Sequence, residues 1–236
     1  MRAGTASLAA MPRREPKPTT SLELAATTTA APADLRPMMP TDGRWPRRGD
    51  DLYDLWWGGG HVVAYLGDDT CRLLGEDGAD ATADHLALAE RLRVLDVPRP
   101  LVVDGEIVGE WPVRGERQAT AAQPTLVAVD LLWHAGRSLL ARPIEARRDA
   151  LLAVAPAGAD GLVCLPALSG DAAALLRLAT DHGLPGLVGK RAHSPYLPGV
   201  RSRLWHVLPT GAGTSATAEE EGRSSPILAV LDRLPL

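Results

Sequence analysis

Short hydrophobic runs and helical hydrophobic periods follow one another through the middle of the chain. Apolar runs on either side of Gly67-Asp68-Asp69 predict a β-hairpin, and later runs broken by turn residues predict further strands. Apolar positions three or four residues apart predict amphipathic helices, the last of them ending at Gly183. The predicted strands are 61–66, 70–74, 101–108, 125–132, 187–190 and 204–208, and the predicted helices are 84–95, 145–154 and 171–182. Early hairpins and later mixed helices favour an α+β domain with antiparallel sheets.

The two ends of the chain lack this periodicity. Residues 1–33 mix Ala, Thr, Pro and Arg and bury too little apolar surface to offset their ordering entropy, so we expect a disordered basic arm. Residues 210–236 combine Thr, Ser and Gly with an acidic run, which predicts a flexible acidic linker that carries a short helix near residues 227–231. The folded domain is therefore expected over residues 34–209.

Composition indicates one ordinary domain with a real core. The chain has 236 residues, of which 45% are hydrophobic, and it contains no Phe, so Leu, Val, Ala and Trp must fill the core. No stretch approaches the roughly 20 apolar residues of a membrane-spanning helix, which excludes a membrane protein. The two cysteines match no metal-ligand spacing, as expected for a reduced cytoplasmic protein. The six histidines show no paired ligand spacing either, so we expect no stable metal site.

Charge is distributed unevenly along the chain. The segment 1–48 carries eight basic and four acidic side chains and the whole chain has a net charge of -4, so the remainder carries -8. An acidic globular part is not typical of a DNA clamp, because Lys and Arg supply most non-specific DNA affinity. Only Lys17 and Lys190 are lysines, which leaves two candidates for any mechanism that needs a lysine nucleophile.

Four segments carry short motifs in a defined order. They are LVVDGEIV at 101–108, VDLL with HAGR and RPIEARR over 129–148, GLPGLVGK at 183–190, and SPYLPG continuing to Trp205 over 194–205. Together they resemble the adenylation domain of ATP-dependent DNA ligases, and most closely the ligase domain of bacterial end-joining ligases. The likeness spans about residues 34–209 and implies an ATP-grasp-like α+β fold, with antiparallel sheets flanked by helices.

The resemblance also implies a chemistry. In that family a lysine amine attacks the α-phosphate of ATP and forms a covalent lysyl-AMP. Basic side chains hold the phosphates, carboxylates bind ribose and metal, and Mg²⁺ helps to offset the charge on the transferring phosphorus. The implied cofactors are therefore ATP and Mg²⁺, and the implied partners are DNA or DNA-repair proteins.

The reactive positions of the family motifs are occupied by other residues here. The segment 53–61, YDLWWGGGH, aligns with Tyr-Glu-x-Lys-Trp-Asp-Gly-x-Arg, which places Trp56 at the nucleophilic lysine and His61 at the arginine. Val129 stands where the family has an adenine-stacking phenylalanine. Other positions that the family fills with charged residues are occupied by Gly58, Glu76, Pro185, Val207 and Pro209. Of the contact residues, only Glu106 and Lys190 are retained.

We therefore expect a pseudoenzyme with a vestigial nucleotide site made of Glu106, Lys190, His61 and Val129, in which Glu106 alone could reach a metal. A neutral indole at Trp56 cannot attack phosphorus, and each lost charged hydrogen bond removes roughly 1.5–3 kcal/mol of ATP affinity. The expected role is a binding or scaffold subunit near DNA end joining. Two alternatives stay open: an active ligase or nucleotidyltransferase that uses an unrecognised lysine, and a gene product without selected activity.

Several of these residues also have a plainer interpretation. Trp56 and Trp57 are a stacking platform for a base or, more simply, core residues in a chain without Phe. Glu106 is a site carboxylate or a solvated acid at a strand end, and Lys190 is a phosphate contact or a salt-bridged lysine. Gly58-Gly59-Gly60 lacks the lysine and helix of a phosphate-binding loop, which favours a flexible turn. Because only 27 residues follow Pro209, we expect no OB-fold domain.

Overall fold

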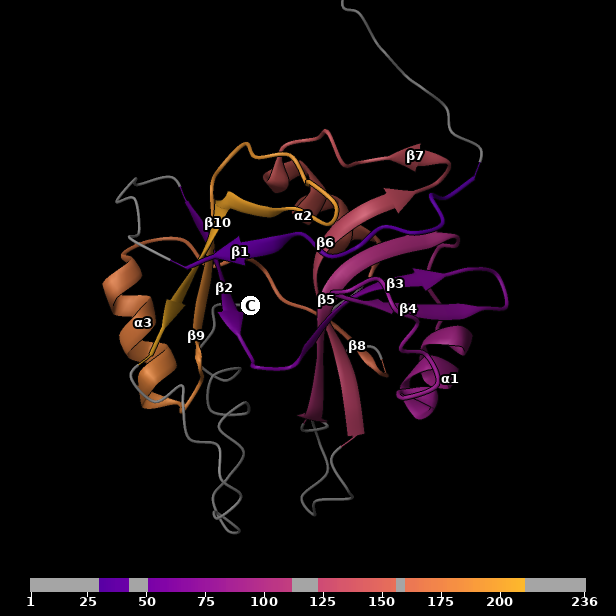
Figure 1. Ribbon diagram of the computed structural model, residues 1–236, viewed down its shortest axis with the longest axis horizontal. Helices are drawn as coiled ribbons and strands as arrows, with labels where there is room; N and C mark the ends of the chain where they lie inside the picture. The colour runs from indigo at the N-terminus through magenta and orange to yellow at the C-terminus, as the bar shows by residue number, and fades with distance from the viewer. Residues whose placement is uncertain (1–29, 43–50, 112–122, 156–159, 211–236) are drawn as a thin grey trace, which may run out of the picture.

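Two β-sheets lie side by side in the computed structural model of the protein, with helices on their outer faces (Figure 1). The structure describes residues 30–42, 51–111, 123–155 and 160–210. The strands are β1 (Met39–Thr41), β2 (Leu52–Trp56), β3 (Gly60–Leu66), β4 (Cys71–Gly75), β5 (Leu101–Trp111), β6 (Gln123–His134), β7 (Arg137–Ser138), β8 (Leu162–Cys164), β9 (Gly186–Lys190) and β10 (Arg201–Pro209). The helices are α1 (Leu86–Val94), α2 (Ile144–Val154) and α3 (Ala172–Asp181). Among the described residues, no helix is long and apolar enough to cross a membrane.

The smaller sheet has four strands in the order β1-β10-β9-β2. Residues alternate between its faces, as strand geometry requires. Tyr53, Leu55 and Leu187 lie on the outer face, where they pack against the apolar side of α3. The Asp171 side chain caps that helix by accepting a hydrogen bond from the backbone N–H of Ala173 at 3.2 Å.

The larger sheet has the order β4-β3-β5-β6-β7, and β8 pairs with β6 at its side. Its outer face packs against α1 and α2 through a continuous apolar core. The buried members include Ala64, Leu88, Leu92, Val103, Leu126, Leu151 and Leu162. The two outer cores hold each sheet to its own helices and leave the inner faces to meet each other.

The inner faces meet in a third core that is rich in aromatic residues. Trp133, Trp205 and Tyr196 are each at least 98% buried in this cluster, and they supply the ring volume that a chain without Phe lacks. Tyr196 and Trp205 make an edge-to-face contact with ring centroids 5.6 Å apart. This core closes one part of the space between the sheets and leaves the other part open as a cavity.

The structure confirms the predicted fold class and every predicted strand and helix, with no end shifted by more than three residues. Four strands were not predicted, namely β1, β2, β7 and β8. The β1–β10 and β6–β8 pairs are parallel, although the other pairs are antiparallel as expected. Residues 1–29 of the predicted arm and residues 211–236 of the predicted linker lie outside the described residues.

Candidate functional site

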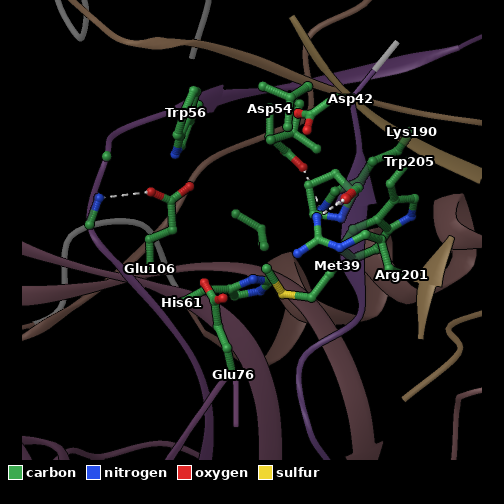
Figure 2. Close-up of a pocket in the computed structure, with 16 residues that line it drawn as sticks. Met39, Asp42, Asp54, Trp56, His61, Glu76, Glu106, Lys190, Arg201 and Trp205 are labelled. Atoms are coloured by element: carbon green, nitrogen blue, oxygen red, sulfur yellow. Dashed lines mark hydrogen bonds and ion pairs between the residues drawn. The ribbon is translucent and has the colours of Figure 1, made fainter. Parts of the chain in front are cut away.

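A cavity of about 300 Å³ lies between the inner faces of the two sheets (Figure 2). Strands β2, β9 and β10 provide one wall, strands β3, β5 and β6 provide the other, and β1 borders it. The lining residues are Met39, Pro40, Asp42, Asp54, Trp56, Gly58, Gly59, His61, Glu76, Glu106, Val129, Val188, Lys190, Arg201, Trp205 and Val207. The cavity thus brings together all five residues that the sequence singled out: Trp56, His61, Glu106, Val129 and Lys190.

The two adjacent tryptophans face in different directions. Trp56 at the end of β2 lines the cavity, on the same side of the strand as Asp54. Trp57 packs against apolar residues of the α3 side and against Val108, Val127 and Val163. Of the two tryptophans, Trp57 is therefore a core residue, whereas the indole of Trp56 forms part of the cavity wall.

Glu106 is held at one end of the cavity by backbone groups of the β2–β3 turn. Its Oε2 accepts hydrogen bonds from the N–H groups of Trp57 and Gly59, each at 3.2 Å. A Cβ at Gly59 would overlap the carbonyl oxygen of Ile107, so only glycine lets the turn approach β5 this closely. Burial raises the pKa of Glu106 to about 7, against the opposing effects of His61 and the two N–H groups.

His61 is paired with a buried carboxylate. Its Nε2 lies 2.7 Å from Oδ1 of Asp104, whose side chain is fully buried. Burial alone would lower the pKa of His61, but the Asp104 carboxylate outweighs it, so the pKa of His61 is raised. The imidazole of His61 lines the cavity, below Glu106 in the view of Figure 2.

Lys190 is engaged in contacts within the protein. The side chain is 2% exposed, and its Nζ lies 2.8 Å from Oδ2 of Asp54 and 3.9 Å from the centroid of the Trp205 ring. Asp54 also pairs through Oδ1 with Nη1 of Arg148 on α2, at 3.0 Å. Burial would raise the pKa of Asp54, but Arg148 and Lys190 together lower it. Of the two interpretations of Lys190, the geometry matches a salt-bridged lysine.

The lining of the cavity is acidic. Among the described residues, four carboxylates line it and only two permanent cations do, Lys190 and Arg201. Asp54 neutralises the first of these cations, and Arg201 donates through Nη1 to the carbonyl oxygen of Pro40 at 2.7 Å. Glu76 and Asp42 are exposed at the rim. Within the described ranges, no three His, Cys, Asp or Glu side chains lie close enough to hold a metal ion, so Glu106 belongs to no such group.

Asp54 and Arg148 are site residues that the sequence analysis did not single out. The alternation of YDLWW at 53–57 was the available signal, since a strand there places residue 54 beside residue 56 on one face. Arg148 entered only as part of the RPIEARR motif, and nothing in that motif specifies a partner on β2. Residues 58–60 form a turn that is more constrained than the flexible turn we predicted, because Gly59 is fitted against β5.

Comparisons with known proteins find similarity over most of the chain. Residues 49–207 match the sequence family described as the ATP dependent DNA ligase domain. The multifunctional non-homologous end joining protein LigD of Mycolicibacterium smegmatis is 30% identical over 193 residues, which are 75% of this chain and 24% of that protein. LigD of Mycobacterium tuberculosis H37Rv is 29% identical over 219 residues, which are 86% of this chain and 28% of that protein. The chain thus spans about a quarter of the length of these relatives.

Solved structures agree with this similarity. The crystal structure of the ligase domain of M. tuberculosis LigD superposes with a TM-score of 0.61 at 28% identity, covering 74% of this chain and 59% of that one. A structure of mycobacterial DNA ligase D complexed with ATP and MES gives a TM-score of 0.61 at 27% identity, covering 73% of this chain and 59% of that one. The fold of this chain is therefore shared with these domains.

Proposed function

Because this chain belongs to the family of ATP-dependent DNA ligases, we propose that it uses the family's domain as a binding or scaffold subunit for DNA end joining and does not transfer AMP. The observation that carries this proposal is the indole of Trp56, which lines the cavity and which the motif resemblance aligns with the family's nucleophilic lysine. An indole has no lone pair that can attack phosphorus as an amine does.

Lys190 is poorly suited to replace the missing amine. A lysine attacks as the neutral amine, which requires an environment that favours loss of its proton. Here the Nζ lies 2.8 Å from Oδ2 of Asp54 and 3.9 Å from the centroid of the Trp205 ring, so the amine is engaged with protein groups rather than directed at a ligand. The side chain is also almost fully buried. The other lysine of the chain, Lys17, lies outside the described residues.

The described residues do not fit ATP and Mg²⁺. A triphosphate needs converging cations, yet the lining carries four carboxylates against two permanent cations, one of which is neutralised by Asp54. Glu76 places a negative charge where the family has a ribose-binding arginine. Each missing charged hydrogen bond costs roughly 1.5–3 kcal/mol of affinity, so loss of several of them removes useful nucleotide binding.

We expect no covalent adenylate when the full chain is incubated with ATP and Mg²⁺ and its intact mass is measured under denaturing conditions. The ligase domain of M. tuberculosis LigD, treated in parallel, serves as the positive control. A stable adenylyl adduct on this chain would contradict the proposal. If that adduct disappears in Lys190→Ala, the active-enzyme alternative with Lys190 as nucleophile is correct.

The proposed partner is DNA, reached through the basic segment 1–48, most of which lies outside the described residues. Binding through Lys and Arg to phosphates releases counterions, so it weakens steeply as salt rises. We expect fluorescently labelled duplex DNA to bind the full chain at low salt, to bind more weakly at moderate salt, and to bind much more weakly after removal of residues 1–29, a truncation that leaves β1 and the buried Met38 in place. Binding that survives the truncation unchanged would assign the DNA contact to the acidic domain and contradict this part of the proposal.

A further inference from the structure

We propose that the cavity binds an organic cation, an ammonium group on a short alkyl chain, with Glu106 and Trp56 as its main contacts. This inference rests on the proposed absence of adenylation and goes further by naming a ligand class for the same cavity. The two sources of such a group are a free polyamine and the side chain of a lysine in another polypeptide. Both sources present the same chemistry, a primary ammonium at the end of an alkyl chain.

The charged side chains that line the cavity favour a cation as its ligand. Asp54 pairs with both Lys190 and Arg148, and His61 pairs with the buried Asp104. Outside these ion pairs, the lining has three carboxyl groups, Glu106, Glu76 and Asp42, and the single permanent cation of Arg201. Among the described residues, no Lys or Arg forms an ion pair with any of these three. A cavity with this charge repels phosphate and attracts a cation.

The surroundings of the Lys190 ammonium show how this protein binds such a group. Lys190 places its ammonium 2.8 Å from a carboxylate, that of Asp54, and 3.9 Å from the centroid of an indole, that of Trp205. Charge pairing and cation–π attraction both stabilise the cation there. The opposite end of the cavity presents the same two groups, the carboxylate of Glu106 and the indole of Trp56 (Figure 2).

The Glu106 carboxylate is positioned to accept a hydrogen bond from a ligand in the cavity. The residue is 91% buried, and its Oε2 is used by the two N–H groups of the turn. Figure 2 shows the other oxygen directed toward the interior of the cavity rather than toward the turn. A buried carboxylate oxygen that faces a cavity is a strong acceptor for a cationic donor, because the surrounding dielectric is low.

The spacing of the acidic groups in the cavity favours an extended ligand over a single small ion. No three of the described acidic, His or Cys side chains converge closely enough for a metal ion, so a single small ion gains no cluster of ligands. Glu106 lies deep in the cavity, whereas Glu76 and Asp42 are exposed at its rim. A diamine can place one ammonium at Glu106 and the other at the acidic rim. Its alkyl chain can contact the apolar lining residues Val129, Val188 and Val207.

The test is calorimetric titration of the full chain with spermidine, putrescine, an Nα-acetylated lysine amide and, as an uncharged control, butanediol. We expect the amines to bind and butanediol not to bind. Glu106→Gln is expected to weaken amine binding about tenfold or more and Glu76→Gln severalfold, since each removes one charge-assisted contact. The matched control Asp181→Asn, an exposed carboxylate on α3 that is outside the cavity, is expected to change the dissociation constant less than twofold.

The pH dependence adds a signature specific to this site. Only the ionised form of Glu106 attracts a cation, and its pKa is about 7, so binding should tighten between pH 6 and pH 8. The charged groups that face Glu106 are His61, Asp54 and, beyond them, Asp104 and Lys190. The pKa of His61 is raised by Asp104, and loss of the His61 proton as pH rises acts in the same direction. Glu106→Gln should remove most of this pH dependence.

The possible outcomes separate the two proposals. Spermidine binding above that of the lysine amide assigns a free polyamine, and the reverse order assigns a lysine side chain. No amine binding, or binding that Glu106→Gln and Asp181→Asn change equally, overturns this inference, and without an adenylate adduct it leaves the proposed function intact. If an adduct is detected by intact mass, the proposed function fails independently of the amine titration.

Discussion

Arg147→Met is expected to lower the free energy of unfolding by about 3–5 kcal/mol at neutral pH, because it leaves a buried carboxylate without its partner. Arg147 and Asp130 are both fully buried, and the guanidinium binds the carboxylate through two hydrogen bonds of 2.8 Å and 2.7 Å. The same guanidinium also donates to the carbonyl oxygens of Arg142 and Ser194. Methionine fills much of the volume but replaces none of these contacts. Urea unfolding followed by circular dichroism measures the loss.

The pH at which the measurement is made tests the cause. Burial raises the pKa of Asp130, and removal of the guanidinium would raise it further, so the carboxyl can take up a proton in the variant. The stability difference should therefore shrink as pH falls. The double variant Asp130→Asn, Arg147→Met should lose less than the two single variants added together. Arg93→Met, which removes an exposed pair with Glu90 on α1, should cost less than about 1 kcal/mol. Equal losses for Arg147→Met and Arg93→Met would refute the explanation.

The fold could be predicted from the sequence where hydrophobic periods are long or turn signals are clear. The hairpin of β3 and β4 and the helix α3 have both, and both lie where they were predicted. β8 and β1 have three residues each, too few for a period, and pairing with β6 and β10 is what makes them strands. β2 was missed because its apolar residues alternate with Asp54 on the inner face, where a charged residue is tolerated only beside Lys190 and Arg148.

The site could be predicted in part. Motif resemblance brought Trp56, His61, Glu106, Val129 and Lys190 together, since homologous strands carry them to one cavity. The partners of Lys190 depend on strand register, which no single segment contains. Trp205 lies directly opposite Lys190 in the β10–β9 pair, and Asp54 lies diagonally opposite across β2–β9. The net charge of the cavity follows from these pairings and from Glu76, so it became visible only when the two sheets were placed.

Asp54→Asn is expected to destabilise the protein by about 3–5 kcal/mol at pH 7, because it leaves two buried cations, Lys190 and Arg148, without a counterion. Asparagine keeps the shape of the side chain, so the change isolates the charge. The ion pairs of Asp54 connect β2 and β9 of the small sheet to α2 on the large sheet, and no other described carboxylate forms an ion pair with either cation. Thermal and urea unfolding of the variant, compared with the unaltered chain, measure the effect.

The sign of the pH dependence follows from the lowered pKa of Asp54. A carboxyl whose pKa is lower in the folded state contributes stability above its unfolded pKa of about 4 and loses it as pH falls through the folded value. The difference between the two proteins should therefore be largest near neutral pH and disappear in strong acid. Asp160→Asn is the matched control, since it removes an exposed Asp–Arg pair with Arg91, and it should cost less than about 1 kcal/mol. If Asp54→Asn costs no more than Asp160→Asn, the two sheets are not held together by this ion pair, and the assignment of Lys190 as a neutralised structural cation is wrong.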